Sequence, residues 1–214
     1  MIYMEAKDME DMEVNSHWRG NNMSSTPDQQ KVYIIHGYRA SPGSHWFPWL
    51  RERLTEAGAD VEILAMPTPQ EPKLDAWITQ VEAAVRDIDS HTYFVAHSLG
   101  CITTLRYLQK QNPAKPIGGI VLVSGFAKPL PELPMLDEFT QQALDDERLI
   151  RSVKRRAVIA AKDDSIVPHA YSKELAERLH ADFYEVEHGG HFLESDGYTA
   201  LPLVADVLAG MMAE

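Results

Sequence analysis

Ser98 lies in a short pattern that can activate a hydroxyl group. The stretch Ala96-His97-Ser98-Leu99-Gly100 follows a buried β-branched run and precedes a helical pattern. A sharp strand-to-helix turn strains the residue at its apex and crowds the positions two before and two after it, so both must be small. Ala96 and Gly100 meet this requirement, with Ala96 where glycine is usual. The alternative is that Ser98 only caps the helix, a common role for serine.

An acid and a histidine follow later predicted strands in the order that serine-based hydrolysis requires. Asp164 comes shortly after a run that ends at Ala161, and His191 follows a run that ends at Val186. A serine hydroxyl is a weak nucleophile until a neutral imidazole takes its proton, and a carboxylate holds that imidazole in the correct tautomer. Separately, each could be a turn or loop residue. Together they predict a catalytic triad of Ser98, Asp164 and His191.

The first apolar run ends at a sequence that can supply an oxyanion hole. Cleavage of an acyl bond places negative charge on the carbonyl oxygen, which preset backbone N–H groups stabilise. Gly37 frees the backbone to turn its amides inward, so we assign the two donors to Tyr38 and to Leu99, the residue after the nucleophile. His36 is better explained as a core histidine that braces this loop than as a catalytic group.

Other residues near these motifs have two interpretations. His36, Trp46 and His97 are candidate substrate-pocket residues, although each could instead pack in the core, as could Phe47 and Trp49 beside them. Cys101 enters the helix after Ser98 and is expected to be a small buried residue rather than a nucleophile.

The elements that position these residues alternate between strands and helices. Six β-branched runs separated by helical patterns predict a parallel sheet covered on both faces. Loops at the carboxyl ends of such strands form the crevice where ligands bind. The predicted strands are Val32 to Ile35, Val61 to Leu64, Tyr93 to Ala96, Ile120 to Val123, Val158 to Ala161 and Phe183 to Val186. The predicted helices lie near 48–58, 74–88, from 99 onward, 168–180 and 201–211.

Composition narrows the function classes. The 214 residues include 44% hydrophobic and 24% charged side chains, as in an ordinary globular protein, and the net charge is −12. Nucleic acid or an anionic membrane is therefore not expected as the main partner, because phosphate contacts need a basic surface. A single cysteine, no apolar run long enough to span a bilayer and no signal-peptide pattern predict a cytoplasmic protein.

Two segments lie outside this alternation. Residues 1–30 show neither helical nor strand periodicity and are expected to form a flexible acidic leader, with an acidic docking tail as the alternative. The folded domain is then 31–214. Residues 127–156 contain three prolines and a helical stretch around Leu136 to Val153, which is long enough to form a small lid.

Four groups of residues resemble those of α/β-hydrolases: His36-Gly37, the turn around Ser98, Asp164 with Val167-Pro168, and Gly190-His191-Phe192. The short length, the block His45-Trp46-Phe47-Pro48-Trp49-Leu50 and the stretch His97-Ser98-Leu99-Gly100-Cys101 are similar to the small serine hydrolases typified by retinoblastoma-binding protein nine and its bacterial relatives. The resemblance covers the chain from Lys31 onward.

This resemblance implies a compact α/β-hydrolase fold that lacks the first two strands, with a six-stranded parallel sheet in the local order 2-1-3-4-5-6. It places the triad acid on Asp164, in the pattern Asp-x-x-Val-Pro, and the base on His191, in Gly-His-Phe. Asp163 is the alternative acid, and His188 is the neighbouring histidine.

The predicted function is hydrolysis of small carboxylic esters through an acyl-enzyme, without a metal or other cofactor. Thioesters, lactones and small amides stay open as substrates because they share the tetrahedral intermediate. Dehalogenases and epoxide hydrolases would use an acidic nucleophile, which Ser98 argues against. The alternative is a protein-interaction module on the same fold, using the leader or the lid. The sequence predicts no oligomeric state.

Overall fold

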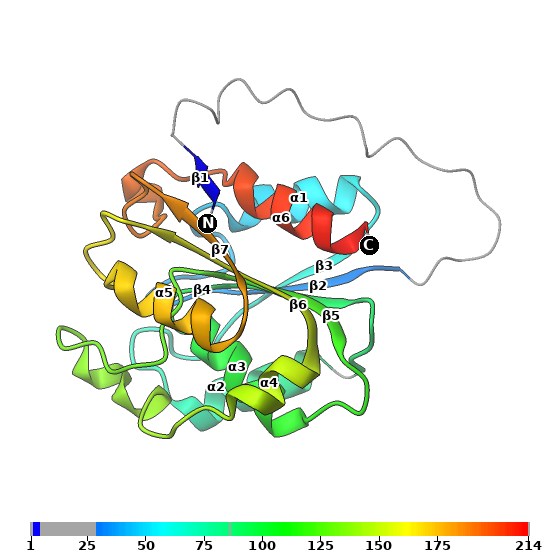
Figure 1. Cartoon of the computed structure of the whole chain (residues 1–214), viewed down its shortest axis with the longest axis horizontal. Helices are drawn as coiled ribbons and strands as arrows, with labels where there is room; N and C mark the ends of the chain where they lie inside the picture. The colour runs from blue at the N-terminus through cyan, green and yellow to red at the C-terminus, as the bar shows by residue number, and fades with distance from the viewer. Residues whose placement is uncertain (1, 5–28, 86, 214) are drawn as a thin grey trace.

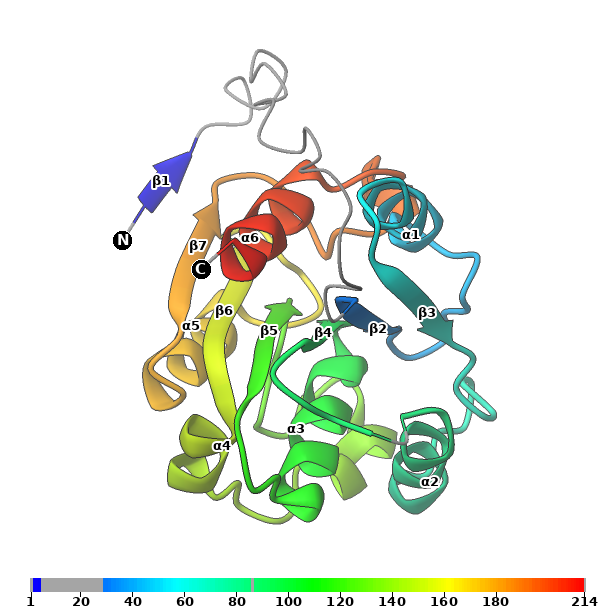
Figure 2. The ribbon, with the colours of Figure 1, turned by 90° about the vertical axis from the view of Figure 1, so that its right-hand side faces the viewer.

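The strands form one sheet of seven strands, and neighbouring strands are parallel. The computed structural model describes residues 2–4, 29–85 and 87–213. The sheet order is β1-β7-β6-β5-β4-β2-β3, as Figure 1 and Figure 2 show. The strands are β1 (Ile2–Met4), β2 (Lys31–Ile35), β3 (Asp60–Leu64), β4 (Thr92–His97), β5 (Ile117–Val123), β6 (Val153–Ala161) and β7 (Asp182–Val186).

The six predicted strands are all present, and their order β3-β2-β4-β5-β6-β7 confirms the expected arrangement. The seventh strand was not predicted. Ile2–Met4 pairs with β7, with Tyr3 opposite Glu185. The prediction that residues 1–30 lack regular structure was therefore wrong at these three positions, and residues 5–28 lie outside the described residues.

Helices cover both faces of the sheet (Figure 1). The helices are α1 (Phe47–Glu56), α2 (Leu74–Ala84), α3 (Leu99–Gln111), α4 (Asp146–Ser152), α5 (His169–Arg178) and α6 (Pro202–Met212). Successive strand residues point to opposite faces, so Ile34 packs with α1 and α6 while Ile35 packs with α2 and α3. Within the described ranges, no helix is both long enough and apolar enough to cross a membrane.

The segment between β5 and β6 differs from its predicted form. The expected helix around Leu136 to Val153 is divided into a 3-10 helix, η3 (Pro134–Phe139), and the short helix α4. The division has a local cause, because the Asp145 carboxylate accepts a hydrogen bond from the Arg148 amide and so starts a new helix. Residues 153–156, which were included in the predicted lid, belong to β6.

The carboxyl ends of the central strands lie at one edge of the sheet. Ile35 of β2 is opposite Ala96 of β4, and His97 of β4 is opposite Val123 of β5. Ala161 of β6 is opposite Val186 of β7. The loops that follow these strands therefore leave the sheet side by side, which brings together residues that are far apart in the sequence.

Candidate active site

Ser98 lies at a strained turn between β4 and α3. Its φ of 54° and ψ of −119° lie outside the regions that L-residues normally adopt, which costs on the order of 1–3 kcal/mol and is typical of functional sites. The Ser98 amide donates a hydrogen bond to the Val123 carbonyl, at 2.9 Å. Ser98 is buried, with 7% of the residue exposed. The geometry is that of a nucleophile elbow rather than of an ordinary helix cap, and no side-chain capping hydrogen bond is present at Ser98.

Small residues make this turn possible. A Cβ atom on Gly100 would lie 2.3 Å from the Ile35 carbonyl oxygen and 2.8 Å from that of His36. A Cβ atom on Gly37 would lie 2.9 Å from the Ser98 Cβ. The end of β2 therefore packs directly against the elbow, which requires glycine at both positions. Ala96 is fully buried in β4 and occupies its position as predicted.

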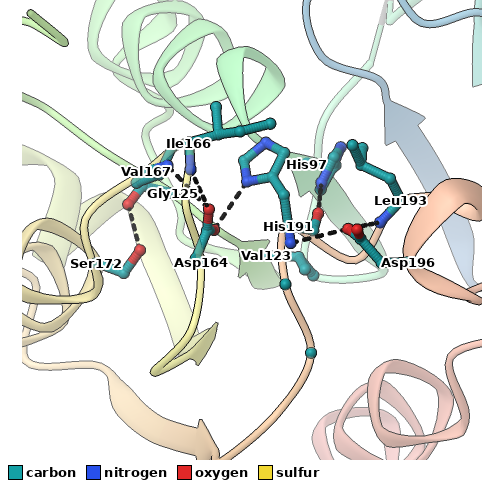
Figure 3. A network of polar contacts seen from close by, with 12 residues as sticks. His97, Val123, Gly125, Asp164, Ile166, Val167, Ser172, His191, Leu193 and Asp196 are labelled. Atoms are coloured by element: carbon teal, nitrogen blue, oxygen red, sulfur yellow. Dashed lines mark hydrogen bonds and ion pairs between the residues drawn. The ribbon is translucent and has the colours of Figure 1, made fainter. Parts of the chain in front are cut away.

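His191 and Asp164 form a hydrogen-bonded pair beside the elbow. The His191 Nδ1 donates to the Asp164 Oδ2 at 2.8 Å (Figure 3). The other carboxylate oxygen, Oδ1, accepts the amides of Ile166 and Val167, both at 2.9 Å. Since Nδ1 carries the hydrogen, Nε2 of a neutral His191 is free to accept a proton. The side chains are 5% and 2% exposed, so this hydrogen bond is shielded from solvent.

Asp163, the alternative acid, has a different role. Its Oδ1 accepts the amides of Gly189 and Gly190, each at 2.8 Å, and its Oδ2 lies 3.4 Å from the His188 Nδ1. Burial of Asp163 acts to raise its pKa, but the hydrogen bonds from the Gly189 and Gly190 amides outweigh this effect and hold the pKa below its ordinary value. Asp163 thus fixes the loop that carries His191, whereas Asp164 contacts His191 itself.

The two predicted oxyanion donors flank the elbow. Leu99 is the first residue of α3, so its amide has no acceptor within the helix. Tyr38 follows Gly37, whose backbone approaches Ser98. Among the backbone hydrogen bonds of the described residues outside regular elements, neither amide is a donor. Both N–H groups are therefore available to an incoming oxygen.

His36 braces the loop that carries Tyr38. Its Nε2 accepts the Met66 amide at 3.1 Å, so Nδ1 carries the hydrogen and donates to the Gly37 carbonyl at 2.9 Å. Burial lowers the pKa of His36 and keeps the ring neutral. The bracing interpretation fits this geometry, and the assignment of His36 to a substrate pocket does not, because the ring is buried and both nitrogens are bonded.

The other two candidate pocket residues also lie inside the protein. Trp46 is fully buried at the start of α1, in the core between α1, α6 and the sheet. His97 is 2% exposed, and its Nε2 donates to the His191 carbonyl at 2.8 Å. The core interpretation therefore fits Trp46, while His97 contacts the backbone of the candidate base.

Cys101 faces the interior. Its thiol donates to the carbonyls of Ala96 and Val123, and burial raises its pKa far above the ordinary range. The thiolate that nucleophilic chemistry needs is thus unfavourable here, in agreement with the predicted packing role.

Two residues that the sequence reasoning missed support the His191 loop. The Asp196 Oδ2 accepts the amides of His191 and Leu193, each at 3.0 Å. The His45 Nδ1 accepts the Glu194 amide at 3.0 Å, which joins the loop before α1 to this one. The sequence Asp196-Gly197 is typical of a turn. The sequence alone does not show that Asp196 accepts the amides of His191 and Leu193. Across the described ranges, no group of three or more His, Cys, Asp or Glu side chains is arranged to hold a metal ion.

A sequence model of the serine hydrolase family matches residues 32–210. The chain belongs to this family. The chain is also 53% identical over 185 residues to the hydrolase YdeN of Bacillus subtilis (strain 168), covering 86% of this chain and 97% of the relative. These matches confirm the expected family, and the family model begins at residue 32.

Further matches are a solved structure of this relative, a second related sequence and a more distant solved structure that shares only the fold. The crystal structure of YdeN matches with a TM-score of 0.86 at 52% identity, over 87% of this chain and 100% of that chain. The serine hydrolase RBBP9 of Rattus norvegicus is 23% identical over 76% of this chain and 86% of its own length. Est1E of Butyrivibrio proteoclasticus shares the fold, with a TM-score of 0.66 at 13% identity over 88% of this chain and 90% of its own.

Proposed function

We propose that this serine hydrolase cleaves small carboxylic esters, with Ser98 as nucleophile, His191 as general base and acid, and Asp164 as the group that orients His191. The observation that carries the proposal is the 2.8 Å hydrogen bond from the His191 Nδ1 to the buried Asp164, beside a serine with a φ of 54°. Loop residues without a catalytic role would need neither a histidine with its hydrogen held on Nδ1 nor a serine with a strained backbone.

The chemistry follows from the arrangement. The Ser98 oxygen bonds to the ester carbonyl carbon while His191 takes the hydroxyl proton. The oxygen that becomes negative is stabilised by the Tyr38 and Leu99 amides and by the N-terminus of α3. The carbon–alkoxy bond breaks as His191 returns the proton to the leaving alcohol. Water then attacks the acyl-enzyme by the same route, which releases the acid and restores Ser98.

The proposed mechanism fits several classes of acyl substrate. Thioesters, lactones and small amides pass through the same type of intermediate, so they belong in the first substrate panel. The modest segment between β5 and β6 favours short acyl groups, and we propose that it forms a small lid. We also propose a cytoplasmic location, because the single cysteine, Cys101, is a buried free thiol, as is usual in a reducing compartment.

The test is covalent labelling with a fluorophosphonate, followed by intact mass and peptide mapping. We expect one adduct per chain on Ser98, and no adduct in the variants Ser98→Ala and His191→Ala. Ser98→Ala should also lower kcat for an activated ester by about a millionfold, as removal of a triad serine does elsewhere. Absence of an adduct on folded wild-type protein would contradict the proposal and favour an interaction module.

A further inference from the structure

His97 is the last residue of strand β4 and directly precedes the nucleophile, yet it is buried in the protein. Its residue is 2% exposed. The His97 Nε2 is 2.8 Å from the His191 carbonyl oxygen, and Figure 3 shows this contact beside the candidate base. A carbonyl only accepts hydrogen bonds, so Nε2 carries the ring hydrogen and donates it.

Aromatic rings hold His97 in place. Its ring centroid is 4.8 Å from that of His191, so the two imidazoles are in contact. The rings of His45, Trp46 and Phe47 pack around its other sides, with centroids 5.7, 6.1 and 5.8 Å away. The side chain therefore has little freedom to turn away from the His191 backbone.

The remaining nitrogen of His97 argues against a purely structural role. In this tautomer Nδ1 is a bare acceptor, and it is buried without a hydrogen-bond partner among the described residues. An unsatisfied buried polar atom costs about 1–3 kcal/mol. An apolar side chain would fill the same space without that cost, so packing alone does not explain a histidine here.

We propose that His97 is a positioning residue that fixes the distance and orientation of His191 relative to Ser98. The inference rests on the proposed function. His97 is joined to Ser98 by a peptide bond and to His191 by a hydrogen bond and a ring contact. The nucleophile and the base are thus connected through a single rigid residue, even though they come from strands β4 and β7.

The electrostatics of the site agree with this role. Burial holds the pKa of His97 well below its ordinary value, and the neighbouring His191 lowers it further. His97 therefore stays neutral while His191 gains and loses a proton. A second positive imidazole in contact with His191 would oppose formation of the imidazolium that the reaction requires.

The experiment compares two polar variants of similar size. Glutamine can place an amide N–H near the position of Nε2, whereas the asparagine side chain is too short to reach the His191 carbonyl. We expect His97→Asn to lower kcat and the rate of fluorophosphonate labelling by about 10- to 100-fold with little change in KM, as small misplacements of catalytic groups do. His97→Gln should recover most of the lost rate.

A matched control is Phe47→Leu, which disturbs packing against His97 but removes no hydrogen bond. It should lower Tm with little effect on the labelling rate. The proposal is overturned if His97→Asn labels at the wild-type rate, or if His97→Asn, His97→Gln and Phe47→Leu all lose rate in proportion to Tm. If the folded wild-type protein does not react with the fluorophosphonate, the proposed function is overturned, and the inference with it.

Discussion

At the carboxyl edge of the sheet, Asp164 and His191 make hydrogen bonds with residues close to them in sequence, in addition to the bond between them. Asp164 binds the amides of Ile166 and Val167, and the His191 amide binds Asp196. The segment between β5 and β6 is held differently. One side chain from α3, Arg106, donates to the carbonyls of Phe139, Gln142 and Ala143.

This contrast shows two ways to fix a loop. Local bonds shape the turns at Asp164 and His191, so short sequence motifs predict these turns. The His191 loop is also held by the more distant Asp163, His97 and His45. The β5–β6 segment takes its position from a residue more than thirty positions away, so its form depends on the assembled fold. Changes at the edge should therefore affect chemistry first, and changes at Arg106 should affect stability first.

The largest expected effect separates the two adjacent acids. Asp164→Asn should lower kcat by about ten-thousandfold, because the amide favours the wrong tautomer of the histidine. Asp163→Asn, its matched control, weakens the support of Gly189 and Gly190 and the contact with His188. Ester hydrolysis by the two purified variants measures the difference, and equal losses would mean that Asp164 has no special role.

The second prediction concerns the steric limits of the elbow. Gly100→Ala should lower the free energy of unfolding by about 3 kcal/mol, because the new methyl group meets the Ile35 carbonyl and backbone must move. Ala96→Gly removes a buried methyl group and should cost about 1–2 kcal/mol while leaving Ser98 reactive. Urea denaturation and labelling rates check both, and a fully stable, reactive Gly100→Ala would refute the close approach of β2.

The third prediction tests whether Arg106 holds the segment between β5 and β6 in place. Arg106→Met leaves the Phe139 carbonyl without its partner, so we expect a loss of about 1–3 kcal/mol and faster proteolysis between β5 and β6. The rate of Ser98 labelling should change little. Arg151→Met on α4 is the control, since Arg151 is exposed and its ion-pair partner among the described residues is Glu147, one turn away. Equal rates of proteolysis in the two variants would show that Arg106 does not hold the segment between β5 and β6.

The smallest effect is a pH dependence of stability. The pKa values of His36, His45 and His97 are all lowered, with burial as the main cause. The unfolded chain therefore binds more protons than the folded one once the pH falls below about 6.5, and the free energy of unfolding should decrease there. His97→Gln should reduce this slope by up to about 1.4 kcal/mol per pH unit. Urea titrations at several pH values measure the slope, and an unchanged slope would mean that His97 does not contribute.

The sequence predicted the features that have local causes. The six strands followed from alternating patterns, and their order followed from the resemblance to α/β-hydrolases. Ser98, Asp164 and His191 were selected as candidates because each closes a short motif at a strand end. The choice between Asp163 and Asp164 needed the Val167-Pro168 pattern, and the 2.8 Å bond to His191 agrees with it.

Features with distant partners were missed or misplaced. Gly118, Gly119 and the charged residues Lys154 to Arg156 hid the first halves of β5 and β6, because such residues are unusual in buried strands. Trp46 could not be assigned to the core from its own surroundings in sequence. The partner of Ile2–Met4 lies at the other end of the chain, so no local pattern revealed that strand.

Two histidines next to the elbow carry their hydrogens on opposite nitrogens. His36 has its hydrogen on Nδ1, and His97 has its hydrogen on Nε2. Both hydrogens are buried and bonded to carbonyl oxygens, so they should exchange slowly with water and give separate low-field proton resonances. Nitrogen-15 chemical shifts would distinguish the two tautomers. The folded protein thus contains its own NMR reporters, one for the oxyanion loop and one for the base, which can be read before any substrate is known.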